Sequence, residues 1–134
     1  MKLPALSLPR EGLIGEYVDF MVGKNDAPLN FHLFSALILI GVCLGSRVWI
    51  PYGNKKLYPN LYVCLLADSS NFRKTTCIRN TKRILRRFEE SLIISDRFSL
   101  ERLFQDLSEK PQGIFMWPEF ASAMKYFQKS YMPG

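Results

Sequence analysis

"LYVCLLADSSNFRKTTCIRNTKRIL", residues 61–85, is the stretch that decides how this chain is expected to fold. It begins with an apolar run rich in β-forming residues, Leu61 to Ala67, of the kind found in strands that are buried on both faces. A short polar loop follows and ends in Lys74-Thr75, where a basic helix begins. This order predicts a unit of an α/β protein, with the loop at the carboxyl end of the strand.

The loop before this helix is close to a phosphate-binding loop of the G-x-x-x-x-G-K-[ST] type. Lys74 and Thr75 fit the last two positions, whereas Asp68 and Arg73 stand where the two glycines would be. Glycine lets the backbone approach the phosphates and adopt positive φ, so a side chain at either position demands a different path. The Arg73 guanidinium can pair with phosphate oxygens directly, but the Asp68 carboxylate would repel them unless it turned away or met a cation.

A second loop, which follows the apolar run 113–117, contains a candidate residue for the same phosphate-binding site. In a Walker B element, a hydrophobic strand ends in an acid that organises Mg²⁺, and here the only acid is Glu119, after Pro118. Taken alone, Glu119 is best interpreted as a first-turn helix residue that favours the helix dipole. Taken together with Lys74, it is interpreted as the acid that organises the metal or orients water.

The remaining pattern alternates between helix and strand. Helices are expected over 11–24, 25–45, 74–91, 100–110 and 119–129, and strands over 47–53, 60–67, 91–95 and 113–117. Helical spacing turns inward Leu13, Tyr17, Val18, Met21, Ile78, Leu85, Phe88, Leu92, Leu100, Leu103, Phe104 and Leu107. The alternation predicts a parallel α/β sheet with right-handed crossovers and helices on both faces, in residues 47–134, after a helical segment in residues 1–46.

Composition sets the class of protein. The 134 residues suit about one domain, and 48% hydrophobic residues are enough for a core. The net charge of +6 suits a phosphate-rich partner without identifying one. Three cysteines, Cys43, Cys64 and Cys77, match no zinc pattern and form a poor disulfide framework, which predicts a cytoplasmic protein. The single histidine, His32, is expected to be a packing residue.

No membrane is expected as a partner. The most apolar stretch, "LFSALILIGVCLG" at 33–45, has 13 residues, whereas a membrane span needs about 20. It also lies too far into the chain for a secretory signal of the usual kind. The stretch is therefore expected to be a fully buried helix.

"YPNLYVCLLADSSNFRKTT" at 58–76, preceded by "GVCLGSRVWIPYG" and followed by "GIFMWPEF", resembles a family of phage- and plasmid-associated P-loop proteins. Relatives of that family include RecA/DnaB-like replicative helicases and primase-linked ATPases of mobile elements. The resemblance covers roughly residues 30–127. It implies a partial RecA-like P-loop fold and the binding of ATP with Mg²⁺. It also implies DNA, a second copy of the chain or a partner ATPase subunit as partners.

The resemblance implies a role for each residue of the loop. Lys74 would meet the β- and γ-phosphates, Thr75 would bind Mg²⁺ through its hydroxyl, and Thr76 could reach the α-phosphate. Glu119 would be the Walker B acid or the base that orients water. The cradle would consist of Ser69, Ser70, Asn71, Phe72 and Arg73.

Hydrolysis of ATP by this chain alone is not expected. No second acidic strand, sensor residue or arginine finger is visible downstream, and phosphoryl transfer depends on such charge neutralisation. The chain is therefore expected to be the N-terminal piece of a longer ATPase or a shortened partner subunit.

The basic helix offers a second hypothesis. A row of cations that could follow a nucleic-acid backbone consists of Arg79, Lys82, Arg83, Arg86 and Arg87. The alternative is a solvated helix face. A small basic and aromatic loop that could stack bases contains Tyr52, Lys55, Lys56 and Tyr58. Two classes of function remain open: an ATP- and Mg²⁺-binding module of a helicase-like motor, and a catalytically inactive structural or interaction protein.

Overall fold

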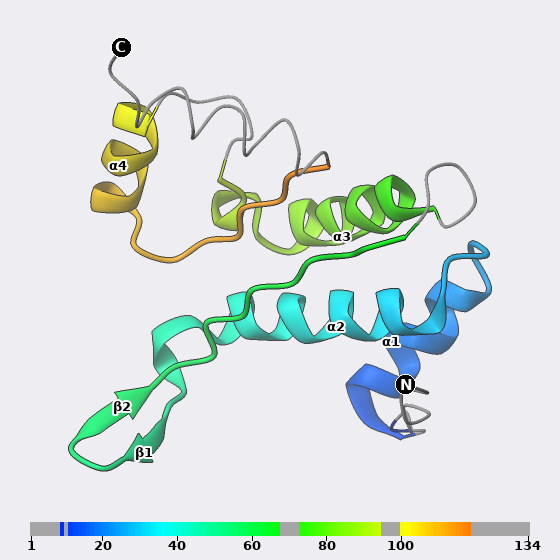
Figure 1. The fold of residues 1–134 in the computed structure, drawn as a ribbon, viewed down its shortest axis with the longest axis horizontal. Coiled ribbons are helices and arrows are strands. Elements are labelled where there is room, and N and C mark those ends of the chain that lie inside the picture. Colours follow the sequence, from blue (N-terminus) through cyan, green and yellow to red (C-terminus); the bar gives the residue numbers. More distant parts are fainter. Residues whose placement is uncertain (1–8, 10, 68–72, 95–99, 119–134) are drawn as a thin grey trace.

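Helices dominate the structure, a computed structural model that describes residues 9, 11–67, 73–94 and 100–118 (Figure 1). Its elements in chain order are α1 (Gly12–Val22), α2 (Leu29–Leu44), the 3₁₀ turn η1 (Gly45–Arg47), β1 (Ile50–Tyr52), β2 (Lys55–Leu57), α3 (Lys74–Glu89), the 3₁₀ turn η2 (Glu90–Leu92) and α4 (Leu100–Glu109). The four α-helices lie within the ranges that the hydrophobic pattern predicts.

The ends of α1 and α2 follow from their residues. α1 ends at Gly23, and α2 begins after Pro28, whose ring fixes φ near the helical value. α2 ends at Gly45, where φ is +52° and ψ is −133°. This positive φ favours glycine, and any larger residue at Gly45 would also displace the end of the Gln112 side chain, whose Cδ would lie 2.2 Å from a Cβ atom there.

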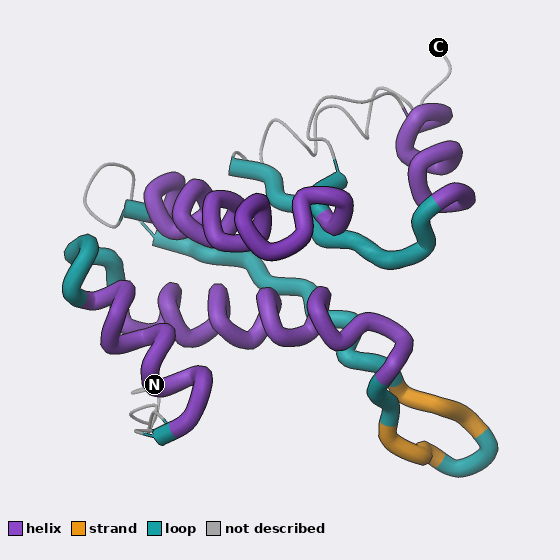
Figure 2. Tube along the Cα trace, turned by 180° about the vertical axis from the view of Figure 1, so that it is seen from behind, coloured by secondary structure: helices purple, strands orange, loops and turns teal. Residues whose placement is uncertain are grey.

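α2 is the central helix of the fold. It packs against α1 on one side and α3 on the other, and residues 58–67 run between α2 and α3 in both views (Figures 1 and 2). The helical run Leu29–Arg47, at 19 residues with a mean hydropathy of 1.8, has the length and composition of a helix that could cross a membrane. It packs against α1 and α3, but 44% of the stretch is buried and Phe34 is 37% exposed, so the prediction of a fully buried helix is wrong.

Two small clusters form the core. One contains Leu39 of α2, Leu85 of α3, and Ile114 and Met116 of the extended segment 113–117. The other joins Ala27, Phe31 and Cys77, against which Leu65 and Ala67 pack. The first cluster therefore joins residues from the predicted segments 1–46 and 47–134.

The predicted parallel RecA-like sheet is wrong. Among the described residues, the only sheet has two antiparallel strands, β1 and β2, which form a hairpin that pairs Ile50 with Leu57 and Tyr52 with Lys55. Parallel pairing is limited to one bridge between Ile93 and Ile114. That bridge uses two hydrogen bonds, from the Ile94 amide to the Ile114 carbonyl and from the Ile114 amide to the Leu92 carbonyl, at 3.0 and 2.7 Å.

The segment 61–67 explains why the prediction fails. It is extended, but no backbone hydrogen bond joins it to another described part of the chain. One side rests on the helices through Leu65 and Ala67, whereas Tyr62 is 98% exposed and Leu66 is 80% exposed. An apolar run predicts burial on both faces only when a second layer covers it, and here the layer lies on one side.

Four predicted core positions are also wrong. Leu13 is 68% exposed, Phe88 71%, Phe104 63% and Leu107 37%, so helical spacing alone does not show which face of these helices is covered. Val18, Met21 and Leu85 are buried, as their helical spacing predicts.

Candidate functional site

The N-terminus of α3 is the place where the predicted phosphate-binding residues lie. Arg73 directly precedes the helix and adopts the left-handed conformation, with φ +48° and ψ +30°. It is the only non-glycine residue with positive φ among those described. The sequence motif places a glycine at this position, and the structure has the backbone conformation that glycine adopts without cost.

The first turn of α3 has amide donors outside the helical ladder and no acidic side chain of its own. The Cys77 amide bonds to the Arg73 carbonyl at 3.1 Å, which leaves the amides of Lys74, Thr75 and Thr76 outside the intrahelical ladder. The first turn contains no acidic side chain, and the side chain of Arg73 does not cap the helix. The amides and the helix dipole therefore favour an anion at this end.

Lys74 connects the two ends of the loop. Its ammonium group donates a hydrogen bond to the carbonyl of Ala67, the last described residue before the loop. The end of the extended segment at Ala67 and the start of α3 at Lys74 are therefore joined by this hydrogen bond. Thr75 is exposed and Thr76 is half-buried, so the Thr75 hydroxyl is open to solvent.

Arg73 has a partner that sequence reasoning missed. Its Nε lies 3.0 Å from Oδ1 of Asp26, in the turn before α2, and both side chains are largely exposed. This contact holds the guanidinium toward α2 and brings a carboxylate near the loop. The expected direct contact of Arg73 with phosphate would therefore compete with Asp26.

Several predicted site residues fall outside the described residues. They are Asp68, Ser69, Ser70, Asn71, Phe72 and Glu119. In the described part of the chain, no three His, Cys, Asp or Glu side chains form a group that could hold a metal ion. Mg²⁺ that arrives with a nucleotide commonly needs only one or two protein ligands, and the Thr75 hydroxyl is the candidate here.

The basic residues of α3 divide between two environments. Arg79, Arg83, Arg86 and Arg87 are exposed, whereas Lys82 is half-buried. The opposite side of the helix carries the buried residues Cys77, Thr81 and Leu85. The structure therefore brings four of the five predicted cations onto the solvent side of α3.

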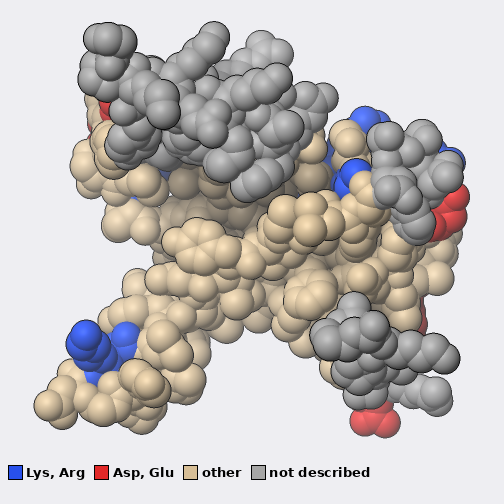
Figure 3. Space-filling model, viewed as in Figure 1, with Lys and Arg blue, Asp and Glu red and all other residues tan. Residues whose placement is uncertain are grey.

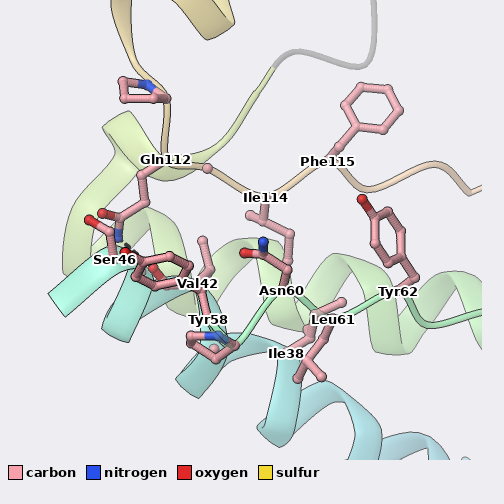
Figure 4. A pocket seen from close by; sticks show the side chains of 15 residues that line it. Ile38, Val42, Ser46, Tyr58, Asn60, Leu61, Tyr62, Gln112, Ile114 and Phe115 are labelled. Atoms are coloured by element: carbon pink, nitrogen blue, oxygen red, sulfur yellow. Dashed lines mark hydrogen bonds between the residues drawn. The ribbon is translucent and has the colours of Figure 1, made fainter. Parts of the chain in front are cut away.

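A cavity of about 600 Å³ lies away from the phosphate loop (Figure 4). It is bounded by the C-terminal end of α2, residues 58–62 and residues 111–115, with Ser46 and Gln112 near one end and Tyr62 and Phe115 near the other. Gln112 is fixed by a hydrogen bond of 2.7 Å from its Nε2 to the Val42 carbonyl. No acid, lysine, arginine or histidine lines the cavity, so we assign it no acid–base chemistry.

The β1–β2 hairpin projects from the body of the molecule (Figures 1 and 3). The predicted loop residues Tyr52, Lys55, Lys56 and Tyr58 all belong to it or border it, and all are exposed. Nζ of Lys56 lies 4.5 Å from the centre of the Trp49 ring, a cation–π contact. The sequence predicted a strand over 47–53 but not its partner Lys55–Leu57.

A buried polar cluster between the three packed helices was missed as a group. His32 is fully buried, and its Nδ1 lies 3.9 Å from Sγ of Cys77. Burial lowers the pKa of His32 and raises the pKa of Cys77, so both are held neutral. A neutral thiol beside a neutral imidazole is a packing arrangement, not an activated nucleophile.

Comparisons of the chain with known protein families, with curated proteins and with solved structures give no match.

Proposed function

We propose that this chain binds ATP together with Mg²⁺ through the loop that precedes α3. The observation that carries the proposal is the left-handed Arg73 immediately before Lys74 at the start of a 16-residue helix. The proposal rests on this loop and helix alone and needs no parallel sheet.

The physical basis is the local charge. The first amides of α3 have no intrahelical acceptor, and the helix dipole places partial positive charge at the same end. A left-handed residue before a helix turns successive amides toward a common point, an arrangement that binds phosphate oxygens. Lys74 adds a full positive charge at the mouth of this arrangement. A triphosphate would therefore find amides, an ammonium group and the Thr75 hydroxyl within one turn of helix.

Phosphate binding would change the contacts of Lys74. Its ammonium group now donates to the Ala67 carbonyl and would exchange this neutral acceptor for an anionic one. Hydrogen bonds to charged acceptors are the stronger kind, so the exchange favours binding. In this proposal Thr75 contributes the protein's hydroxyl ligand to Mg²⁺, and Glu119 its carboxylate. The role as part of a helicase-like or primase-associated motor, which the resemblance implies, stays a prediction.

Isothermal titration calorimetry tests the binding. Wild-type protein is titrated with ATP and with a non-hydrolysable analogue, with and without Mg²⁺, beside Lys74→Ala. Lys55→Ala is the matched control, because it removes one exposed lysine from the hairpin. Binding that depends on Mg²⁺ and is lost in Lys74→Ala but kept in Lys55→Ala supports the proposal. Absence of heat from folded wild-type protein at millimolar nucleotide would reject it.

The exposed side of segment 61–67 favours a second candidate, an interaction protein. Tyr62 and Leu66 are apolar, strongly exposed and on an extended segment whose backbone has no strand partner among the described residues. Such an edge pairs readily with another extended chain, and antiparallel pairing with a second copy is self-complementary.

Sedimentation velocity over a range of concentrations tests this second candidate. The candidate predicts a dimer that is lost in Tyr62→Ser/Leu66→Ser, with circular dichroism unchanged. A monomer at every concentration would exclude self-pairing through this edge.

A further inference from the structure

The solvent side of α3 carries a row of arginines. Arg79, Arg83 and Arg87 are four residues apart, so they lie one above another on one face, and Arg86 lies on the same side. These four residues are called the arginine face. α3 lies on the near side in Figure 2, in front of residues 58–67. The apolar side of the helix, with Leu85, is turned into the core.

The arginine face lacks compensating charge. Arg86 has a loose ion pair with Glu90, with 3.6 Å between Nε and Oε1. In the part of the chain that the structure describes, Arg79, Arg83 and Arg87 have no carboxylate within ion-pair distance. Like charges four residues apart destabilise a helix. The helix dipole offsets this for Arg86 and Arg87 in the last turn, but not for Arg79 and Arg83 in the middle. A polyanion would remove the repulsion along the whole row.

The guanidinium groups and the length of the row indicate which class of polyanion the arginine face can bind. Guanidinium groups bind phosphate oxygens through paired hydrogen bonds. The eight-residue rise from Arg79 to Arg87 is about 12 Å. That length corresponds to three or four nucleotide steps of one strand, at about 3.4 Å of axis each. A lipid surface would also need apolar side chains beside the cations. Cys77 and Leu85 of α3 pack inside the protein, and the exposed Phe88 lies on a side of the helix away from the arginine face.

We propose that the arginine face of α3 binds the phosphodiester backbone of a nucleic acid. The row consists of arginines, with Asn80 at its border, and a straight row of guanidinium groups matches a line of phosphates, so contact is made mainly to the backbone. Binding is therefore independent of sequence and strongly dependent on salt. This surface is separate from the phosphate loop at the start of the same helix, and it does not rest on the binding of ATP.

Fluorescence anisotropy with labelled oligonucleotides tests the proposal. Single-stranded and duplex DNA of mixed sequence are titrated with protein in about 50 to 200 mM salt. The test variant is Arg79→Gln/Arg83→Gln/Arg87→Gln. The control is Lys24→Gln/Arg47→Gln/Lys110→Gln, which removes the same number of exposed charges outside α3 and outside the hairpin. A third variant, with lysine at the three arginine positions, keeps the charge and checks that the helix tolerates substitution.

Each outcome either supports or rejects the binding of nucleic acid by the arginine face. We expect the glutamine variant to bind at least about tenfold more weakly and to reduce the log–log salt slope by about 2 to 3. The control and the lysine variant should keep most of the slope. Equal losses in test variant and control would overturn the proposal, because binding would then reflect net charge alone. No binding of wild-type protein to either DNA, or binding only to vesicles of anionic lipid, would also overturn it.

Discussion

His32 shows how a single residue can make the stability of this fold depend on pH. It lies among the helices beside Cys77, and its Nε2 has no hydrogen-bond partner among the described atoms. Near it, the Tyr17 hydroxyl is close to Thr81 and Ser35 without the geometry of a full hydrogen bond, and burial raises the pKa of Tyr17. Burial therefore favours the neutral form of His32, Cys77 and Tyr17 alike.

A pH titration of stability tests this position. Burial lowers the pKa of His32 in the folded state, so below about pH 6.5 the unfolded chain binds the proton more tightly. We expect the free energy of unfolding to be constant between about pH 6.5 and 8 and to fall below pH 6.5, by up to about 1.4 kcal/mol per pH unit. Above about pH 8 it should fall as well, because burial raises the pKa of Cys77. Urea titrations at several pH values measure it. His32→Leu should remove the slope between pH 6.5 and 5, and an unchanged slope would contradict the account.

Substitutions at Arg73 test whether the backbone before α3 is left-handed in solution. Arg73→Gly and Arg73→Ala both lose the ion pair with Asp26, so they differ mainly in the cost of positive φ. We expect the glycine variant to be more stable than the alanine variant by about 1 kcal/mol. Urea denaturation of the two variants measures the difference. Equal stability would mean that this residue does not hold the left-handed conformation in solution.

At the scale of elements, α3 depends on one buried side chain. Leu85 is 1% exposed and packs against Leu39, Ile114 and Met116. Leu85→Ala should lower the free energy of unfolding by about 2 to 5 kcal/mol, because it leaves a cavity where three segments meet. Phe88→Ala on the same helix is the control. Phe88 is 71% exposed, so we expect a change within about 0.5 kcal/mol, measured by thermal or urea unfolding. A similar loss in both variants would place Phe88 in the core.

The helices could be predicted from the sequence because their signals are local. Pro28, Gly23 and Gly45 mark helix ends through backbone chemistry that needs no tertiary partner. The sheet could not be predicted in this way. The apolar run 61–67 specifies an extended backbone, but strand pairing depends on segments distant in sequence, and the described residues provide no backbone partner for it.

Part of the candidate site could be predicted because its signals are also local in sequence. Lys74 and Thr75 lie at the start of a helix, as the motif requires, and positive φ occurs at Arg73, where the motif has glycine. The contact between Arg73 and Asp26 spans 47 positions and has no sequence signal. The exposure of Phe88 likewise depends on what the helix packs against.

At the scale of the whole molecule, charge and apolar surface are segregated. Residues 58–67 contain no charged side chain, and in Figure 3 the middle of this face is largely neutral, with blue atoms at the hairpin and blue and red atoms at the opposite, right-hand end. The arginine face belongs to α3, whose N-terminus carries the proposed phosphate loop. In the two proposals, one helix would bind anions at its end and along its side.

The central claim is that phosphates bind at the end of α3, and an NMR titration tests it most directly. Backbone amide shifts of ¹⁵N-labelled protein are followed as ATP with Mg²⁺ is added. The account predicts the largest changes at residues 73–77, with smaller changes along Arg79 to Arg87 and in the hairpin. Changes centred on the arginine face or the hairpin, or no changes at millimolar ATP, would contradict it.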